Sequence, residues 1–321
     1  MLWMTSALDS IRRRVSSKQR PFPPAVMWLT AVLTLMVLPG ARGLAQDVTG
    51  TFVPIEVPGA SFTVARAITA DGRIVGFFGE ANGRQHGFLL ADGSFTTIDV
   101  PVPGARSTQA FGINARGDIV GSWVDSGGVQ HGFHLPAYGS LIVIDGPAAI
   151  RTLARGINAA GDIVGYYDTP DKRHGFLLSR EGVFSTIDMD GAQGPPPNGT
   201  FSQWINARGA VVGSWFDGSV HGFLMSGDIV TQLDVPFPGA IHTNAPGLND
   251  RGDIVGFYTV SGRQVAFRRD RHGNYESLDA PTPTPASSTL AIGINTPGDI
   301  VGQYTHNGVT RGFVVYRTPT P

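Results

Sequence analysis

The chain has 321 residues, including 43 glycines and 23 prolines, and it contains no cysteine. Only 15% of the residues are charged and the formal net charge is −1, so the chain lacks the basic surface expected of a nucleic-acid-binding protein. The lack of cysteine excludes disulfides, thiolate chemistry and a lipoprotein anchor. A chain of this length can bury a large core, and its glycine and proline content favours short strands joined by tight turns.

Residues 1–45 are predicted to be a secretory signal peptide. Basic residues between Arg12 and Arg20 precede an apolar run over residues 25–38, which is shorter than the roughly 20 residues of a membrane-spanning helix. Gly43 and Ala45 form a small-x-small pattern that predicts cleavage after Ala45. An uncleaved membrane anchor is the alternative, and Arg12-Arg13 matches a twin-arginine export signal only in part.

Cleavage at this position would change the charge and the compartment of the chain. It removes six basic residues and one acidic residue, which leaves a net charge near −6. We therefore expect a protein exported to the periplasm, the cell surface or the medium, with no membrane contact after cleavage. Because such a protein without cysteine is stabilised by packing alone, we also expect a large closed core.

Residues 46–316 contain six copies of one unit, and the clearest copy runs from Ile113 to Gly121. Spacings of 43 to 48 residues separate the glycines that end this motif. A fixed period in this range indicates a repeat architecture. The six glycines are Gly76, Gly121, Gly165, Gly213, Gly256 and Gly302.

The first full copy predicts four short strands, over residues 63–68, 73–78, 85–90 and 94–100. The Asp92-Gly93 pair predicts a tight hairpin between the last two strands. The second strand is apolar without alternation, so both of its faces must be covered, and we expect its glycine to allow close approach of a neighbouring repeat. Stacked copies that close into a ring meet this need. The predicted fold is therefore an all-β, six-bladed β-propeller of four-stranded antiparallel blades.

The last copy is split between the two ends of the chain. After Arg311 to Phe313 the chain ends at Pro321 without a fourth strand, whereas residues 51–60 resemble residues 94–105. We therefore expect a strand over residues 51–57 to complete the last blade by pairing with the strand around residues 312–316. The propeller then covers residues 46–316, and residues 317–321 form a short tail.

The turn before the second strand begins with Asn114 and is followed by Asp118 in the clearest copy. An aspartate at this position in several copies could suggest calcium binding. The spacing lacks the alternating acidic residues of a calcium loop, whereas asparagine followed by glycine is typical of a turn. We therefore predict a turn, and neither a metal nor a cofactor.

The third predicted strand carries a His-Gly-Phe triplet that begins at His86, His131, His174 and His221. The repeats resemble those of the HAF-family extracellular repeat proteins, named for a His-Ala-Phe triplet, over about residues 49–316. Glycine replaces alanine in these four copies, and the last two copies lack the histidine. The resemblance implies export and a repeated β fold, and it implies no known activity.

Each of these histidines is expected to bond an aspartate on the fourth strand of its own blade. A metal site built from four histidines is the alternative, but equivalent third-strand positions lie far apart in a ring. In the split blade an arginine and a glutamate replace the histidine and the aspartate. The fifth copy is the exception, because Val265 stands opposite Asp279 and cannot pair with it. The predicted structural pairs are His86 with Asp99, His131 with Asp145, His174 with Asp188, His221 with Asp234, and Arg311 with Glu56.

The sequence contains no catalytic motif, so no catalytic residue is assigned. It has no Gly-x-Ser-x-Gly, no His-Glu-x-x-His and no phosphate-binding loop. A pair of carboxylates for glycoside hydrolysis is not excluded by the sequence, because the spacing of residues along the chain does not give their distance in a ring.

An aromatic residue stands two positions after each repeated glycine, and an acid follows closely in four copies. The rings could pack between blades, or they could form a platform for a glycan or peptide. The solvent exposure of Trp123 and Trp215 distinguishes these two hypotheses. The candidate ligand-binding residues are Phe78, Trp123, Tyr167, Trp215, Tyr258, Tyr304, Glu80, Asp125, Asp168 and Asp217.

These observations predict an exported, non-enzymatic and monomeric binding or scaffold module. Its ligand would be a glycan, a peptide or a protein, bound on the face that carries the blade-to-blade loops. The alternative is a polysaccharide-active hydrolase or lyase built on the same propeller.

Overall fold

The computed structural model describes residues 50–317, which form 24 β-strands and no helix. Among these residues there is accordingly no helix that could cross a membrane. The predicted signal peptide over residues 1–45 and most of the predicted tail lie outside the described residues.

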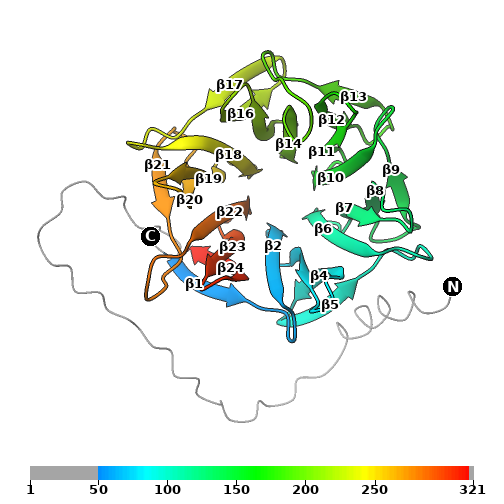
Figure 1. Cartoon of the computed structure of the whole chain (residues 1–321), viewed down its shortest axis with the longest axis horizontal. Helices are drawn as coiled ribbons and strands as arrows, with labels where there is room; N and C mark the ends of the chain where they lie inside the picture. Colours follow the sequence, from blue (N-terminus) through cyan, green and yellow to red (C-terminus); the bar gives the residue numbers. More distant parts are fainter. Residues whose placement is uncertain (1–49, 318–321) are drawn as a thin grey trace, which may run out of the picture. The chain divides into compact units, whose positions relative to one another are not determined.

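The strands form six four-stranded antiparallel repeats arranged around a common centre (Figure 1). In repeats 1 to 5 the strands follow each other from the centre to the rim in chain order. Repeat 1 contains β2 (Phe62–Ile68), β3 (Ile74–Gly79), β4 (Gln85–Ala91) and β5 (Ser94–Ile98). Repeat 2 contains β6 (Ser107–Ile113), β7 (Ile119–Val124), β8 (Gln130–Leu135) and β9 (Ile142–Ile144).

Repeats 3, 4 and 5 have the same layout. Repeat 3 contains β10 (Arg151–Ile157), β11 (Ile163–Asp168), β12 (Arg173–Leu178) and β13 (Phe184–Ile187). Repeat 4 contains β14 (Thr200–Ile205), β15 (Val211–Phe216), β16 (Val220–Ser226) and β17 (Ile229–Leu233). Repeat 5 contains β18 (Ile241–Leu248), β19 (Ile254–Val260), β20 (Arg263–Arg269) and β21 (Tyr275–Leu278).

Repeat 6 joins the two ends of the described chain. It contains β22 (Ser288–Ile294), β23 (Ile300–His306), β24 (Val309–Arg317) and β1 (Gly50–Ile55). β1 pairs with β24 in an antiparallel register that runs from Gly50 opposite Arg317 to Ile55 opposite Gly312. The ring of Phe52 stacks on that of Phe313, with 4.9 Å between the centroids. The predicted pairing of the N-terminal strand with the last repeat is confirmed.

The repeated glycine of the second strand is crowded by its own repeat. A Cβ atom on Gly121 would lie 2.0 Å from the carbonyl oxygen of Gln109 in β6 and 2.7 Å from the Phe133 ring in β8. The phenylalanine of the His-Gly-Phe triplet thus lies directly over this glycine. The expectation that this glycine admits the neighbouring repeat was wrong. The first strand does so instead: a Cβ on Gly156 would lie 2.9 Å from Cα of Trp204 in the next repeat.

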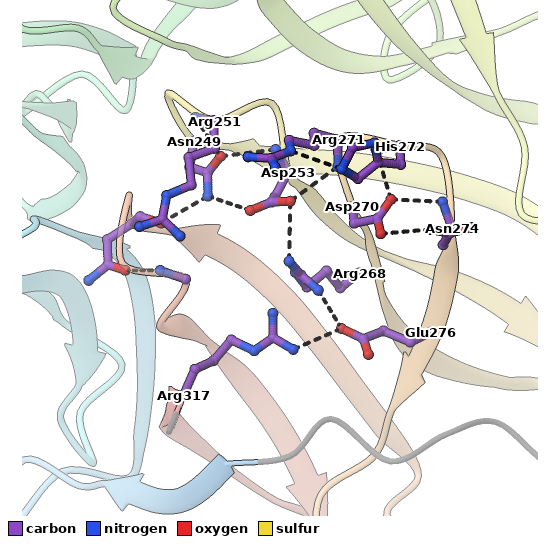
Figure 2. A network of polar contacts seen from close by, with 12 residues as sticks. Asn249, Arg251, Asp253, Arg268, Asp270, Arg271, His272, Asn274, Glu276 and Arg317 are labelled. Carbon is purple, nitrogen blue, oxygen red and sulfur yellow. Dashed lines mark hydrogen bonds and ion pairs between the residues drawn. The ribbon is translucent and has the colours of Figure 1, made fainter. Parts of the chain in front are cut away.

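The turn before the second strand also links neighbouring repeats. In repeat 5, Asn249 Nδ2 donates a hydrogen bond of 3.0 Å to Asp253 Oδ2 (Figure 2). It donates another of 3.0 Å to the backbone oxygen of Asn295 in repeat 6. Asn295 Nδ2 in turn donates to the carbonyl oxygen of Thr69 at 3.1 Å, which ties repeat 6 to repeat 1. The same side-chain bond to the next repeat is made by Asn114, Asn158 and Asn206.

The turn aspartate serves as an acceptor within this network. Asp253 Oδ1 accepts from the backbone N–H of Arg271 at 3.2 Å and lies 3.2 Å from Arg268 Nη2. Arg268 Nη1 donates to Glu276 at 2.8 Å, and Arg317 of repeat 6 lies 3.6 Å from the same oxygen (Figure 2). The aspartate oxygens are therefore occupied by protein donors, as expected for a residue that stabilises a turn.

Candidate functional site

Each of the four triplet histidines lies between a carboxylate and an aromatic ring of its own repeat. His86 Nδ1 lies 2.9 Å from Asp99 Oδ1, and its ring stacks on Phe78 with 5.4 Å between the centroids. The corresponding distance is 3.0 Å in the other three pairs, His131–Asp145, His174–Asp188 and His221–Asp234. The corresponding stacked or tilted rings are Trp123–His131, Tyr167–His174 and Trp215–His221.

Three of the acidic ligand candidates face the second nitrogen of the same histidines. Glu80 lies 3.4 Å from His86 Nε2, and Asp217 lies 3.3 Å from His221 Nε2. Asp125 lies 3.6 Å from His131 Nε2. These carboxylates lie in the turn between the second and third strands of repeats 1, 2 and 4, where they flank the histidine.

Asp168 lies in a different environment, which corrects its assignment as a ligand-binding residue. Its side chain is only 2% exposed, and it accepts hydrogen bonds from Arg173 at 2.6 and 2.9 Å and from Arg151 at 2.5 Å. Burial by itself would raise the pKa of Asp168. The hydrogen bonds and charges of Arg173, and then of Arg151, outweigh this effect, so the pKa of Asp168 lies below its usual value. The carboxylate is part of a buried ion cluster and has no free oxygen to offer.

Cations replace the histidine in the last two repeats. Arg311 Nε donates to Glu56 at 2.9 Å, so the split repeat brings the predicted pair together. In repeat 5 an ion pair with Arg263 engages Asp279. Asp279 therefore has a partner that the sequence pattern missed, because Arg263 lies two residues before Val265 on the same side of β20.

The six aromatic candidates do not form an open platform. Trp123 is only 7% exposed, and Tyr167, Tyr258 and Tyr304 are also buried. Phe78 and Trp215 are half-buried. Burial at four positions agrees with the packing role, because a ring that stacks on a ligand must be open on one face.

Trp215 lines a surface pocket. This pocket lies between repeats 3 and 4, is open to solvent and has a cavity volume of about 260 Å³. Gln232 Nε2, on the same wall, donates to Asp234 at 2.6 Å. The pocket thus combines an indole ring with carboxylates and an amide. Its lining residues are Asp188, Met189, Asp190, Trp215, Val230 and Gln232.

A Pro-rich insertion over residues 191–198 borders this pocket. The backbone N–H of Gln193 donates to the Phe216 carbonyl at 2.9 Å, and its side chain donates to the Asp217 carbonyl at 2.6 Å. These bonds hold the insertion against the end of β15, where Trp215 lies. The insertion was visible in the sequence, but the contributions of Asp190, Val230 and Gln232 were not, because they depend on the packing of one repeat against the next.

Replacing His86 by alanine is expected to lower the free energy of unfolding by about 1–3 kcal/mol, because the change removes the partner of Asp99 and the ring that stacks on Phe78. His272 is exposed in a turn and provides the control, since His272→Ala removes little packing. Urea unfolding of both variants measures the difference. Equal midpoints would contradict a stabilising role for the His86–Asp99 pair.

Comparisons with known proteins identify the fold and no family. No protein-family model and no curated protein matches the chain. A protein assigned as TolB from Agrobacterium tumefaciens aligns with a TM-score of 0.51 and 12% identity, over 79% of this chain and 91% of that one. A lectin from Aleuria aurantia in complex with Fucα1-6GlcNAc aligns with a TM-score of 0.50 and 14% identity, over 82% of this chain and 99% of that one.

Another structure of the same lectin, described as a six-bladed β-propeller, aligns with a TM-score of 0.49 and 14% identity over 82% of this chain and 99% of that one. At these identities the similarity concerns the fold alone, and only the alignments with TM-scores of 0.50 or more bear on it. The six four-stranded antiparallel repeats around one centre are those of an all-β protein of the β-propeller type.

Proposed function

We propose that this chain is an exported, six-bladed β-propeller of the HAF-repeat type, closed by β1, and that it acts as a binding module for a glycan. The observation that carries this proposal is the pocket between repeats 3 and 4. Trp215 offers an apolar ring edge there, and Gln232 and Asp190 offer a donor and acceptors at its side. Sugars present an apolar face together with hydroxyl groups, and they match this combination.

The size and charge of the pocket narrow the ligand class. A pocket of about 260 Å³ is close to the lower end of the range of small-ligand sites. Asp188 is already paired with His174 and Lys172, whereas Asp190 forms no ion pair within residues 50–317 and disfavours an anionic ligand by like-charge repulsion. The ligand class is therefore a neutral oligosaccharide. β1 covers the edge of β24, and the outer strands of the six repeats are only 3 to 6 residues long, which leaves short edges for pairing between copies and supports a monomer.

Binding of neutral oligosaccharides by the chain from residue 46 onward, measured on a glycan array and then by calorimetry, tests the proposal. Gln232→Ala should weaken binding about tenfold or more, because the amide is exposed and borders the pocket. Thr231→Ala, a change at the neighbouring exposed residue that does not line the pocket, should leave affinity unchanged. Trp215→Ala should also weaken binding. Equal affinities of the Gln232 and Thr231 variants would refute the assignment of the pocket.

A polysaccharide-active enzyme is the second candidate, because two carboxylates line the same pocket and glycosidases use such pairs. Release of reducing ends from a bound oligosaccharide would show this activity. Asp190→Asn should then abolish release while binding persists. Binding without any release supports the binding module.

A further inference from the structure

A second cavity lies where the first strands of the six repeats meet. Its cavity volume is about 10 Å³, roughly the room for one water-sized group, and every repeat contributes at least one residue to its wall. Two of these residues are arginines, Arg66 from β2 and Arg155 from β10. The remaining wall residues are Phe111, Gln203, Trp204, Pro246 and Ile292.

The two guanidinium groups share one aromatic ring and have few acceptors. The guanidinium carbon of Arg155 lies 4.6 Å from the centroid of the Phe111 ring, and that of Arg66 lies 5.3 Å from it. Arg155 Nη2 donates to Gln203 Oε1 at 3.2 Å. Arg66 Nε is buried without a hydrogen-bond partner, and across residues 50–317 neither arginine forms an ion pair with a carboxylate.

This lack of counter-charge distinguishes the pair from the other interior arginine of repeat 3. Arg173 is more deeply buried than either of them, with a side chain only 2% exposed, but it is paired with Asp168. Burial lowers the pKa of Arg66 well below its usual value, and the nearby charge of Arg155 lowers it further. Burial also lowers the pKa of Arg155. Both side chains keep some solvent contact, as expected for the wall of a narrow channel. Two partly buried positive charges without a counter-charge destabilise the folded state. An anion between them would remove much of this destabilisation.

We propose that this central cavity binds a small monatomic anion, of halide size, between Arg66 and Arg155. The anion would accept a hydrogen bond from the unpartnered Arg66 Nε and would neutralise the repulsion between the two guanidinium groups. The Phe111 ring and the apolar side chains of Pro246 and Ile292 exclude larger hydrated ions from the remaining space. This site is independent of the Trp215 pocket, so its anion is a structural ligand of the ring.

Thermal unfolding of the chain from residue 46 onward tests the proposal, with bromide as the probe and gluconate at the same ionic strength as the reference. An anion that binds the folded state raises Tm with the logarithm of its concentration. Bromide should therefore raise the Tm of the wild type above its value in gluconate, and Arg66→Met and Arg155→Met should abolish this difference. Arg84→Met, at an exposed turn, is the control and should keep it. An equal bromide effect in all four proteins, or none in the wild type, would overturn the proposal.

A second measurement needs no variant and stays decisive if the arginine substitutions prevent folding. Crystals of the wild-type chain soaked in bromide should show an anomalous peak in the cavity, near Arg66 and Arg155. The same soak provides a control at exposed arginines such as Arg84. Peaks at exposed arginines with none in the cavity would overturn the proposal.

Discussion

A chain that lacks residues 47–60 is expected to lose roughly 3–6 kcal/mol of stability from two side chains alone. Ile55 is only 4% exposed, and Phe52 stacks on Phe313. Each large apolar side chain contributes about 1.5–3 kcal/mol when it is buried. The deletion also exposes the edge of β24, and unpaired strand edges promote association. Urea unfolding measures the first effect, and size-exclusion chromatography measures the second.

The exposure pattern of β1 provides a matched control within the full chain. Thr51 and Val53 are exposed, whereas Phe52 packs into the core between repeats 5 and 6 and Ile55 packs into the core between repeats 6 and 1. The double variant Phe52→Ala/Ile55→Ala should reproduce most of the loss in stability. Thr51→Ala/Val53→Ala should leave the urea midpoint nearly unchanged. If the two double variants unfold together, β1 does not contribute to the core of the ring.

The repeat architecture could be predicted from the sequence because its signals are local and repeated six times. The predicted strands over residues 63–68 and 85–90 match β2 and β4 within one residue at each end. The split repeat was visible because residues 51–60 resemble an internal fourth strand, and β1 pairs with β24 accordingly. The crowding at Gly121 could not be assigned, since the sequence does not show which ring lies over a glycine.

The site was harder to predict, because exposure depends on contacts between repeats. Trp123 and Trp215 occupy equivalent positions, but only the connection before repeat 4 carries the Pro-rich insertion beside a pocket. A shared sequence position therefore did not give shared exposure. Arg66 and Arg155 carried no sequence signal, since an arginine at this position in two of the six first strands gains its neighbour only when the ring places the strands around one centre.

Replacing Asp168 by asparagine is expected to cost about 3–5 kcal/mol, because it leaves Arg173 enclosed without its counter-charge. The Arg173 side chain is only 2% exposed, and its guanidinium carbon lies 4.4 Å from the ring centroids of both Tyr166 and Phe201. Arg173 Nη1 also donates to the Pro197 carbonyl at 2.9 Å, which ties the insertion to this cluster. The variant should therefore unfold at lower urea concentration, and the insertion should become more sensitive to proteolysis.

The double variant Asp168→Asn/Arg173→Met separates loss of the pair from burial of a single charge. Methionine restores apolar packing between the two rings without a charge, so the double variant should recover most of the stability lost by Asp168→Asn. A double variant that is no more stable than the single one would contradict this account.

The pH dependence of stability gives an independent check on the same carboxylate. The pKa of Asp168 is lower in the folded protein than in the unfolded chain, where an aspartate has a pKa of about 3.9. The contribution of Asp168 to the free energy of unfolding is therefore complete above the pKa of the unfolded chain. It is lost as the pH falls through the lower pKa of the folded protein, because the unfolded chain binds the proton first. Wild-type stability should therefore fall more steeply below about pH 4 than that of Asp168→Asn. Parallel pH profiles would show that the Asp168 carboxylate is not held in its charged form by Arg173 and Arg151.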